Sequence, residues 1–200
     1  NGSLQRNQMT IQSDKWIKSQ LNMITSLISN QVKSFKNRKV ISFGVTSYGY
    51  DVRLAPEMKL FDPYCQRVIN PKHFDERILI DLELQTDNEG AKFFLLPPHS
   101  FALGRSLESF KIPRNVLGVC VGKSTYARCG LIVNVTPIEP EFEGTVTLEF
   151  SNTTALPIMI FANEGIAQFL FLKGDNPCDV SYADRNGKYQ NQLEITPPKV

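Results

Sequence analysis

Residues 145–152 read Thr-Val-Thr-Leu-Glu-Phe-Ser-Asn, and their pattern decides the fold class. Polar and apolar side chains alternate along this stretch, which predicts a β-strand with one face in the core. Leu148 and Phe150 would lie on the core face, and Thr147 and Glu149 on the other. Glu149 is thus a carboxylate within a strongly apolar strand. If its face is partly buried, its pKa rises toward the range of a general base.

Short segments of a similar kind recur from residue 40 onward. The stretches 78–82, 93–98 and 116–121 are rich in β-branched and aromatic residues and are separated by Pro, Gly and Asn. Many short strands between such turn residues are typical of sandwiches and barrels. We therefore expect a mainly β fold.

The N-terminal part of the chain has a different periodicity. From Asp14, with Ser13 as an acceptable N-cap, apolar residues recur near helical spacing as far as Ile28. This pattern predicts an N-terminal helix with a break near Asn22.

Composition limits the class of protein. The chain has 200 residues, 42% of them hydrophobic, and no shift of composition along its length. We expect one domain over residues 9–200, and we interpret residues 1–8 as a tag remnant or a disordered N-terminus. The 22 basic and 20 acidic residues are scattered, so we expect no nucleic-acid partner.

The compartment is indicated by the apolar stretches and by the cysteines. Because Pro, Gly or charge interrupts the apolar stretches, we expect no export signal and no membrane partner. The four cysteines are far apart and form no C-x-x-C pair, so a reducing cytoplasm is the expected setting. For Cys129 we expect a buried packing role.

Two common kinds of catalytic site are disfavoured. Zinc deaminases carry H-x-E and P-C-x-x-C motifs, and the chain has neither. His73 and His99 lie in segments typical of loops, which gives a Ser-His-Asp triad little support.

Residues 122–128 read Gly-Lys-Ser-Thr-Tyr-Ala-Arg and gather polar side chains beside an apolar strand. The segment predicts a helical turn that would present backbone N–H groups with Lys123, Ser124 and Arg128 to a phosphate. As a P-loop the signal is weak, because one glycine of that motif is missing. The alternative for this segment is a solvated connection between strand and turn that binds no ligand. The alternative for Glu149 is a carboxylate that faces water or pairs with an arginine for structural reasons.

Four motifs resemble those of the dCTP deaminase family. They read Ser-Tyr-Gly-Tyr-Asp-Val-Arg at 47–53, Gly-Lys-Ser-Thr-Tyr-Ala-Arg at 122–128, Val-Asn-Val-Thr-Pro at 133–137 and Thr-Leu-Glu-Phe-Ser-Asn at 147–152. The resemblance extends from about Ile11 to the C-terminus. Several long motifs in the expected order are far more specific than one short pattern.

The resemblance implies a fold and an assembly. The family consists of homotrimers of distorted β-barrels of the dUTPase-like (β-clip) type. Each active site lies at a subunit boundary, and a C-terminal arm reaches it. For this chain we therefore expect such a barrel, with a short N-terminal helix, in a homotrimer.

The resemblance also implies an activity, the zinc-independent hydrolytic deamination of dCTP to dUTP and ammonia, which supplies dUTP as a precursor of dUMP for thymidylate synthesis. Mg²⁺ would be bound through the triphosphate, with no metal ligand among the protein side chains. Glu149 matches the family's catalytic glutamate, which relays protons between water and cytosine, and Ser124 and Arg128 match its catalytic partners. The other substrate-binding residues that the motifs imply are Lys123, Thr125, Tyr126, Ala127, Thr147, Leu148, Gln168, Tyr182, Lys188 and Gln192.

One departure from the family pattern leaves alternatives open. Glu139 stands where dUTPases and many deaminase relatives have Asp, which in dUTPases activates the hydrolytic water. The longer side chain makes triphosphate hydrolysis less favourable without excluding it. The alternatives are a bifunctional deaminase and dUTPase that yields dUMP and pyrophosphate, or a trimer that binds nucleotide without catalysis.

Overall fold

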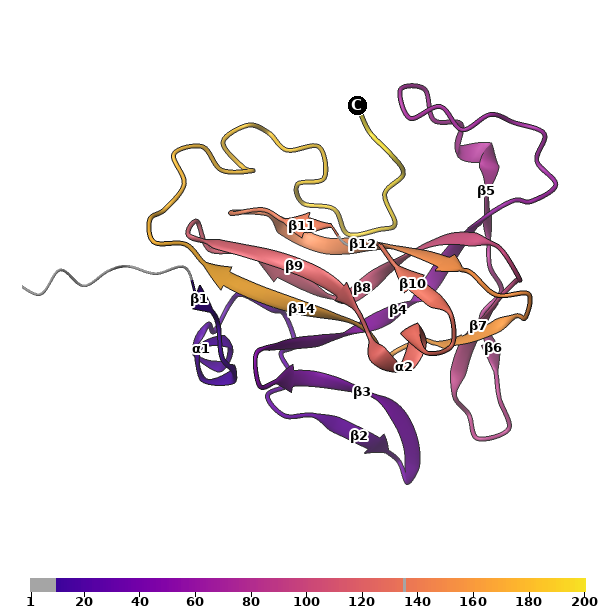
Figure 1. The fold of residues 1–200 in the computed structure, drawn as a ribbon, viewed down its shortest axis with the longest axis horizontal. Coiled ribbons are helices and arrows are strands. Elements are labelled where there is room, and N and C mark those ends of the chain that lie inside the picture. Colours follow the sequence, from indigo (N-terminus) through magenta and orange to yellow (C-terminus); the bar gives the residue numbers. More distant parts are fainter. Residues whose placement is uncertain (1–9, 135) are drawn as a thin grey trace, which may run out of the picture.

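The computed structural model of the chain describes residues 10–134 and 136–200, which form a mainly β structure with two short helices (Figure 1). Residues 1–8, interpreted as a tag remnant or a disordered N-terminus, lie outside the described residues. The single domain over residues 9–200 stays a prediction. The helices are α1 (Asp14–Ser19) and α2 (Ser124–Ala127), and a 3₁₀ turn spans Glu76–Ile78. The strands are β1 (Thr10–Ile11), β2 (Val32–Phe35), β3 (Arg38–Thr46), β4 (Gly49–Phe61), β5 (Leu79–Asp81), β6 (Gln85–Thr86), β7 (Lys92–Leu96), β8 (Phe101–Lys111), β9 (Val116–Gly122), β10 (Leu131–Val133), β11 (Pro137–Ile138), β12 (Glu143–Asn152), β13 (Ile158–Phe161) and β14 (Gly165–Lys173).

Strand β4 joins the two halves of the larger sheet. That sheet runs β10-β12-β8-β4-β14-β9-β11, and a smaller sheet runs β13-β7-β6. The register between β4 and β8 shifts between Leu54 and Met58, on either side of Pro56. Such irregularities bend a strand, and proline cannot donate to the ladder. The sheet therefore curls around its core (Figure 1), which confirms the predicted distorted β-barrel.

The core lies inside the curl and is dominated by aromatic side chains. Tyr50, Phe110, Phe150 and Phe169 are all fully or almost fully buried. The rings of Phe110 on β8 and Phe169 on β14 have centroids 4.7 Å apart, so they link strands on either side of β4. Burial of this apolar area is the main stabilising contribution to the fold.

The N-terminal helix is shorter than the periodicity predicts. Helix α1 ends at Ser19, and Leu21 is 87% exposed. Beyond α1 the chain lies along β8, where the Thr25 backbone N–H donates to the Ser109 carbonyl at 2.9 Å. This tertiary pairing outweighs the local helical pattern. No helix of the described residues is long and apolar enough to cross a membrane.

Candidate active site

Strand β12 places Glu149 on the face that the alternation predicts. Leu148 and Phe150 are buried in the core, whereas Thr147 and Glu149 are half-buried on the opposite face. Glu149 is paired with Leu103 of β8. The carboxylate therefore lies beside an apolar side chain on a strand held in the sheet.

An irregularity between β8 and β12 determines which residues of β12 lie opposite those of β8. The register shifts between Thr145 and Thr147. At the shift, the Val146 backbone N–H donates to Ser106 Oγ at 2.8 Å, and Ser106 Oγ donates to the Glu108 carbonyl at 2.7 Å. Because Ser106 is fully buried, its hydroxyl replaces a ladder hydrogen bond that the shift would otherwise leave unmade.

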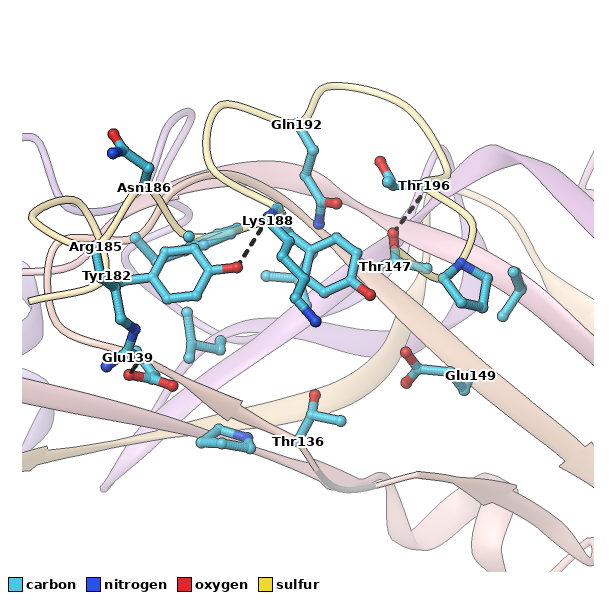
Figure 2. Close-up of a pocket in the computed structure, with 18 of the residues that line it drawn as sticks. Thr136, Glu139, Thr147, Glu149, Tyr182, Arg185, Asn186, Lys188, Gln192 and Thr196 are labelled. Atoms are coloured by element: carbon cyan, nitrogen blue, oxygen red, sulfur yellow. Dashed lines mark hydrogen bonds and ion pairs between the residues drawn. The ribbon is translucent and has the colours of Figure 1, made fainter. Parts of the chain in front are cut away.

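A cavity of about 670 Å³ lies on the outer face of β12. Glu149 and Thr147 enter it from the strand, and residues of the C-terminal tail cover it (Figure 2). Its apolar wall contains Phe61, Phe101 and Leu103. The cavity thus combines an apolar wall with a few polar groups, which is typical of a small-molecule site.

The surroundings of the Glu149 carboxyl disfavour its ionised form. Its burial raises its pKa from 4.5 to about 6. Its Oε2 is buried, with no hydrogen-bond partner in the described part of the chain, and the same holds for Gln192 Oε1 in the same cavity. Two unsatisfied buried acceptors favour a ligand that brings hydrogen-bond donors.

The C-terminal tail is hydrogen-bonded to β12. Gln192 Nε2 donates to the Thr145 carbonyl at 2.7 Å, and the Thr145 N–H donates to the Gln192 carbonyl at 2.9 Å. The Thr196 N–H donates to Thr147 Oγ1 at 3.2 Å. The tail also carries Tyr182 and Lys188 to the cavity. Five of the predicted site residues are thereby brought together, namely Thr147, Glu149, Tyr182, Lys188 and Gln192.

The other predicted polar residues form a separate surface. Ser124, Thr125, Ala127 and Arg128 are exposed on and just after α2. As far as the structure describes the chain, the lining of the cavity includes none of residues 123–128. The predicted site residues of one chain therefore lie in two separate places, the cavity beside β12 and the surface around α2.

Lys123 and Gln168 lie near each other on the second surface. Lys123 Nζ is 2.6 Å from Asp51 Oδ2, in an ion pair that is largely buried. Gln168 on β14 is paired with Asp51 of β4, and its Nε2 donates to Thr46 Oγ1 at 3.1 Å. The aspartate therefore fixes the ammonium at the start of α2.

The structure limits two predicted substrate contacts and corrects one prediction of burial. Leu148 is 1% exposed and its side chain packs in the core, so a contact between Leu148 and a ligand in the cavity would come from its backbone. Tyr126 is buried, and its hydroxyl accepts a hydrogen bond from the Phe161 N–H at 2.9 Å, which makes it a link between α2 and β13. Cys129 is exposed rather than packed, because it follows α2 on the outer surface.

Further lining residues did not stand out in the sequence. Arg185, Tyr189 and Thr196 line the cavity from the tail, and Thr136 lines it just before β11. Arg185 and Tyr189 could have been identified from the sequence, because they lie close to Tyr182 and Lys188 in the chain. The described residues contain no group of three or more His, Cys, Asp or Glu side chains that could hold a metal ion.

A half-buried carboxyl in a tail-covered cavity with nearby cations defines a site for acid–base chemistry on an anionic small molecule. The family described as dCTP deaminase-like matches residues 11–174, and the chain belongs to this family. It is 56% identical over 194 residues to a dCTP deaminase from Azotobacter vinelandii, and 54% identical over 194 residues to one from Francisella tularensis subsp. novicida. Each comparison covers 96% of the chain and 100% of the relative.

A solved structure supports the fold. The crystal structure of 2'-deoxycytidine 5'-triphosphate deaminase from Agrobacterium tumefaciens superposes with a TM-score of 0.59 at 16% sequence identity. The superposition covers 83% of the chain and 48% of that longer chain. At this identity the likeness concerns the fold alone.

Proposed function

We propose that the chain catalyses the hydrolytic deamination of dCTP to dUTP and ammonia. The observation that carries the proposal is Glu149, a carboxyl with a pKa of about 6 and an unpaired buried oxygen in a cavity covered by the tail. Relatives that are 54–56% identical over nearly the whole chain are named dCTP deaminase. The product would be a precursor of dUMP for thymidylate synthesis.

The proposed chemistry needs one group that both accepts and donates protons. Water attacks C4 of cytosine and loses a proton to Glu149, which passes it to N3. Glu149 then takes the proton of the new C4 hydroxyl and passes it to the amine, so that the C4 carbonyl forms as the C4–N bond breaks and ammonia leaves. A carboxyl with a pKa near 6 exists in both forms around neutral pH, and such a group accelerates a reaction by about 10²–10⁴-fold. The apolar wall formed by Phe61, Phe101 and Leu103 would limit competing water.

We further infer that Ser124 and Arg128 reach Glu149 from a neighbouring subunit of a homotrimer. Both residues are exposed on their own chain and lie outside the described lining of its cavity. A guanidinium near Glu149 would stabilise the ionised form, and a hydroxyl could orient the attacking water. Each site would then combine the cavity of one subunit with residues 123–128 and Gln168 of the next.

The triphosphate would be bound by cationic and polar groups of both surfaces. Tyr182, Lys188 and Gln192 supply these from the tail, and Lys123 from the start of α2. Mg²⁺ would be held by the nucleotide phosphates and would reduce their negative charge. The reaction at C4 uses no zinc in this proposal. The four free cysteines favour the cytoplasm as the compartment of the protein.

The decisive assay incubates the protein with dCTP and Mg²⁺, without added zinc, and measures nucleotides, ammonia and pyrophosphate. We expect dUTP and ammonia in equal amounts, with no pyrophosphate. Formation of dUMP and pyrophosphate would instead establish the bifunctional enzyme. Binding of dCTP without turnover would leave a non-catalytic nucleotide-binding trimer.

Sharing of the site between subunits can be tested by complementation. Glu149→Gln and Arg128→Gln chains are expressed separately and together with different tags, and mixed trimers are purified through both tags. Each variant alone should retain only a small fraction of the original activity. In every trimer that holds both variants, about a third of the subunit boundaries, one of the three, would combine an intact Glu149 with an intact Arg128. Mixed trimers without activity would show that both residues act within one chain.

A further inference from the structure

Arg185 and Glu139 form an ion pair at the edge of the cavity. Arg185 lies in the tail, and Glu139 follows β11, so the pair ties the tail to the body of the subunit. Figure 2 shows this pair on one side of the cavity, Glu149 on the other, and Lys188 between them. The tail therefore places one cation, Arg185, at the end of the cavity remote from Glu149, and a second, Lys188, between the two.

The Arg185 guanidinium also lies over an aromatic ring. Its Cζ is 5.5 Å from the centroid of the Tyr182 ring. That ring is itself fixed, because the Tyr182 hydroxyl accepts a hydrogen bond from the Tyr189 N–H at 2.9 Å and its edge packs against Phe142. The ring attracts the guanidinium independently of Glu139, so the ion pair is not the only contact that keeps Arg185 at this edge of the cavity.

The pair with Glu139 is suited to exchange. The Arg185 and Glu139 side chains are 46% and 36% exposed, and ion pairs with this much solvent contact are weak. A polyphosphate offers a guanidinium more negative charge and two acceptor oxygens at once. Neighbouring Lys188 adds a second cation, whose Nζ donates to the Lys199 carbonyl at 3.2 Å.

We propose that Arg185 binds the triphosphate, and that Glu139 holds its guanidinium in the nucleotide-free protein. Nucleotide binding transfers the guanidinium from Glu139 to the phosphates, which fastens the tail over the substrate. Glu139 thus competes with the phosphates for Arg185 and sets how tightly they bind. This inference rests on the proposed function, because it takes a nucleoside triphosphate as the ligand.

The test compares two ligands in three variants. Inorganic tripolyphosphate with Mg²⁺ has no base or sugar, so its Kd reports the phosphate contacts alone, whereas dCTP turnover gives KM and kcat. The variants are Arg185→Gln, Glu139→Gln and the control Arg77→Gln. The control removes an equal charge from an exposed ion pair with Asp75 in the 3₁₀ turn before β5.

Removal of the guanidinium should weaken phosphate binding and leave the chemistry intact. Arg185→Gln should raise the Kd for Mg-tripolyphosphate and the KM for dCTP by about 10- to 100-fold. Its kcat should stay within about twofold of the original value. Glu139→Gln should lower the Kd for Mg-tripolyphosphate, because the guanidinium is then free, and Arg77→Gln should change neither constant.

The possible failures are distinguishable. Unchanged Kd and KM in Arg185→Gln would overturn the inference, and so would weaker tripolyphosphate binding in Glu139→Gln, since the pair would then be holding the tail in its binding position. If the unaltered protein does not deaminate dCTP, the proposed function fails. The tripolyphosphate comparison still decides whether Arg185 binds phosphates.

Discussion

The replacement Glu149→Gln should abolish turnover and also stabilise the protein above pH 6. Burial raises the pKa of the Glu149 carboxyl from 4.5 to about 6, so the ionised form is less stable in the folded chain than in the unfolded one. Below pH 4.5 both states are protonated and no difference exists. As pH rises from 4.5 to 6 the unfolded state releases its proton first, and folding stability falls by about 2 kcal/mol.

Glutamine has nearly the same shape and cannot ionise, so it removes this loss. Thermal unfolding is measured from pH 4 to 8 in an Arg128→Gln background, where no guanidinium of a neighbouring subunit can offset the burial of Glu149. Near pH 8 the glutamine variant should unfold about 4–8 °C higher, and near pH 4 the two curves should coincide. Turnover, measured with Arg128 intact, should fall by at least about 10²-fold. A constant stability difference at every pH, or retained kcat, would refute the assignment.

Three further changes test the register of β12, the neighbouring subunit and the tail. Ser106→Ala leaves the buried Val146 N–H without its acceptor and should lower the free energy of unfolding by about 1–3 kcal/mol, as measured in urea; Ser106→Thr keeps the hydroxyl and serves as the control. Arg128→Gln should shift the acidic limb of the kcat/KM profile to higher pH, since the ionised Glu149 loses a stabilising cation and its pKa rises; an unshifted limb would show that Arg128 does not lie near Glu149. Truncation before Tyr182 should raise KM for dCTP while size-exclusion chromatography still shows the trimer, and an unchanged KM would rule out a lid.

The strands could be predicted from the sequence because alternation reports burial directly. In the stretch 145–152, Leu148 and Phe150 lie in the core and Glu149 lies on the opposite face, as the pattern predicts. The helix after Asp14 forms, as predicted, but it ends earlier than the pattern indicates, because periodicity carries no information about an available strand edge. The chain beyond Ser19 pairs with β8 instead of continuing the helix.

The chemical identity of the site could be predicted better than its geometry. The motifs indicated Glu149 and Arg128, but no local pattern shows that one enters a cavity while the other is exposed on the outer surface. The burial of the Tyr126 side chain could not be predicted for a related reason. A motif gives only the place of Tyr126 in the chain, whereas the Tyr126 hydroxyl accepts a hydrogen bond from the N–H of Phe161, 35 residues away.

The proposed division of the site between two surfaces would give assembly a chemical role. In a single chain Glu149 has a buried oxygen without a partner and a raised pKa, and Lys123 at the start of α2 is already paired with Asp51. A carboxylate of this kind is unfavourable until a cation or a ligand donor reaches it. If Arg128 of a neighbouring subunit supplies that cation, trimer formation relieves the unfavourable burial and completes the catalytic site in the same step. The stability of the assembly and its activity should then depend on the same contact.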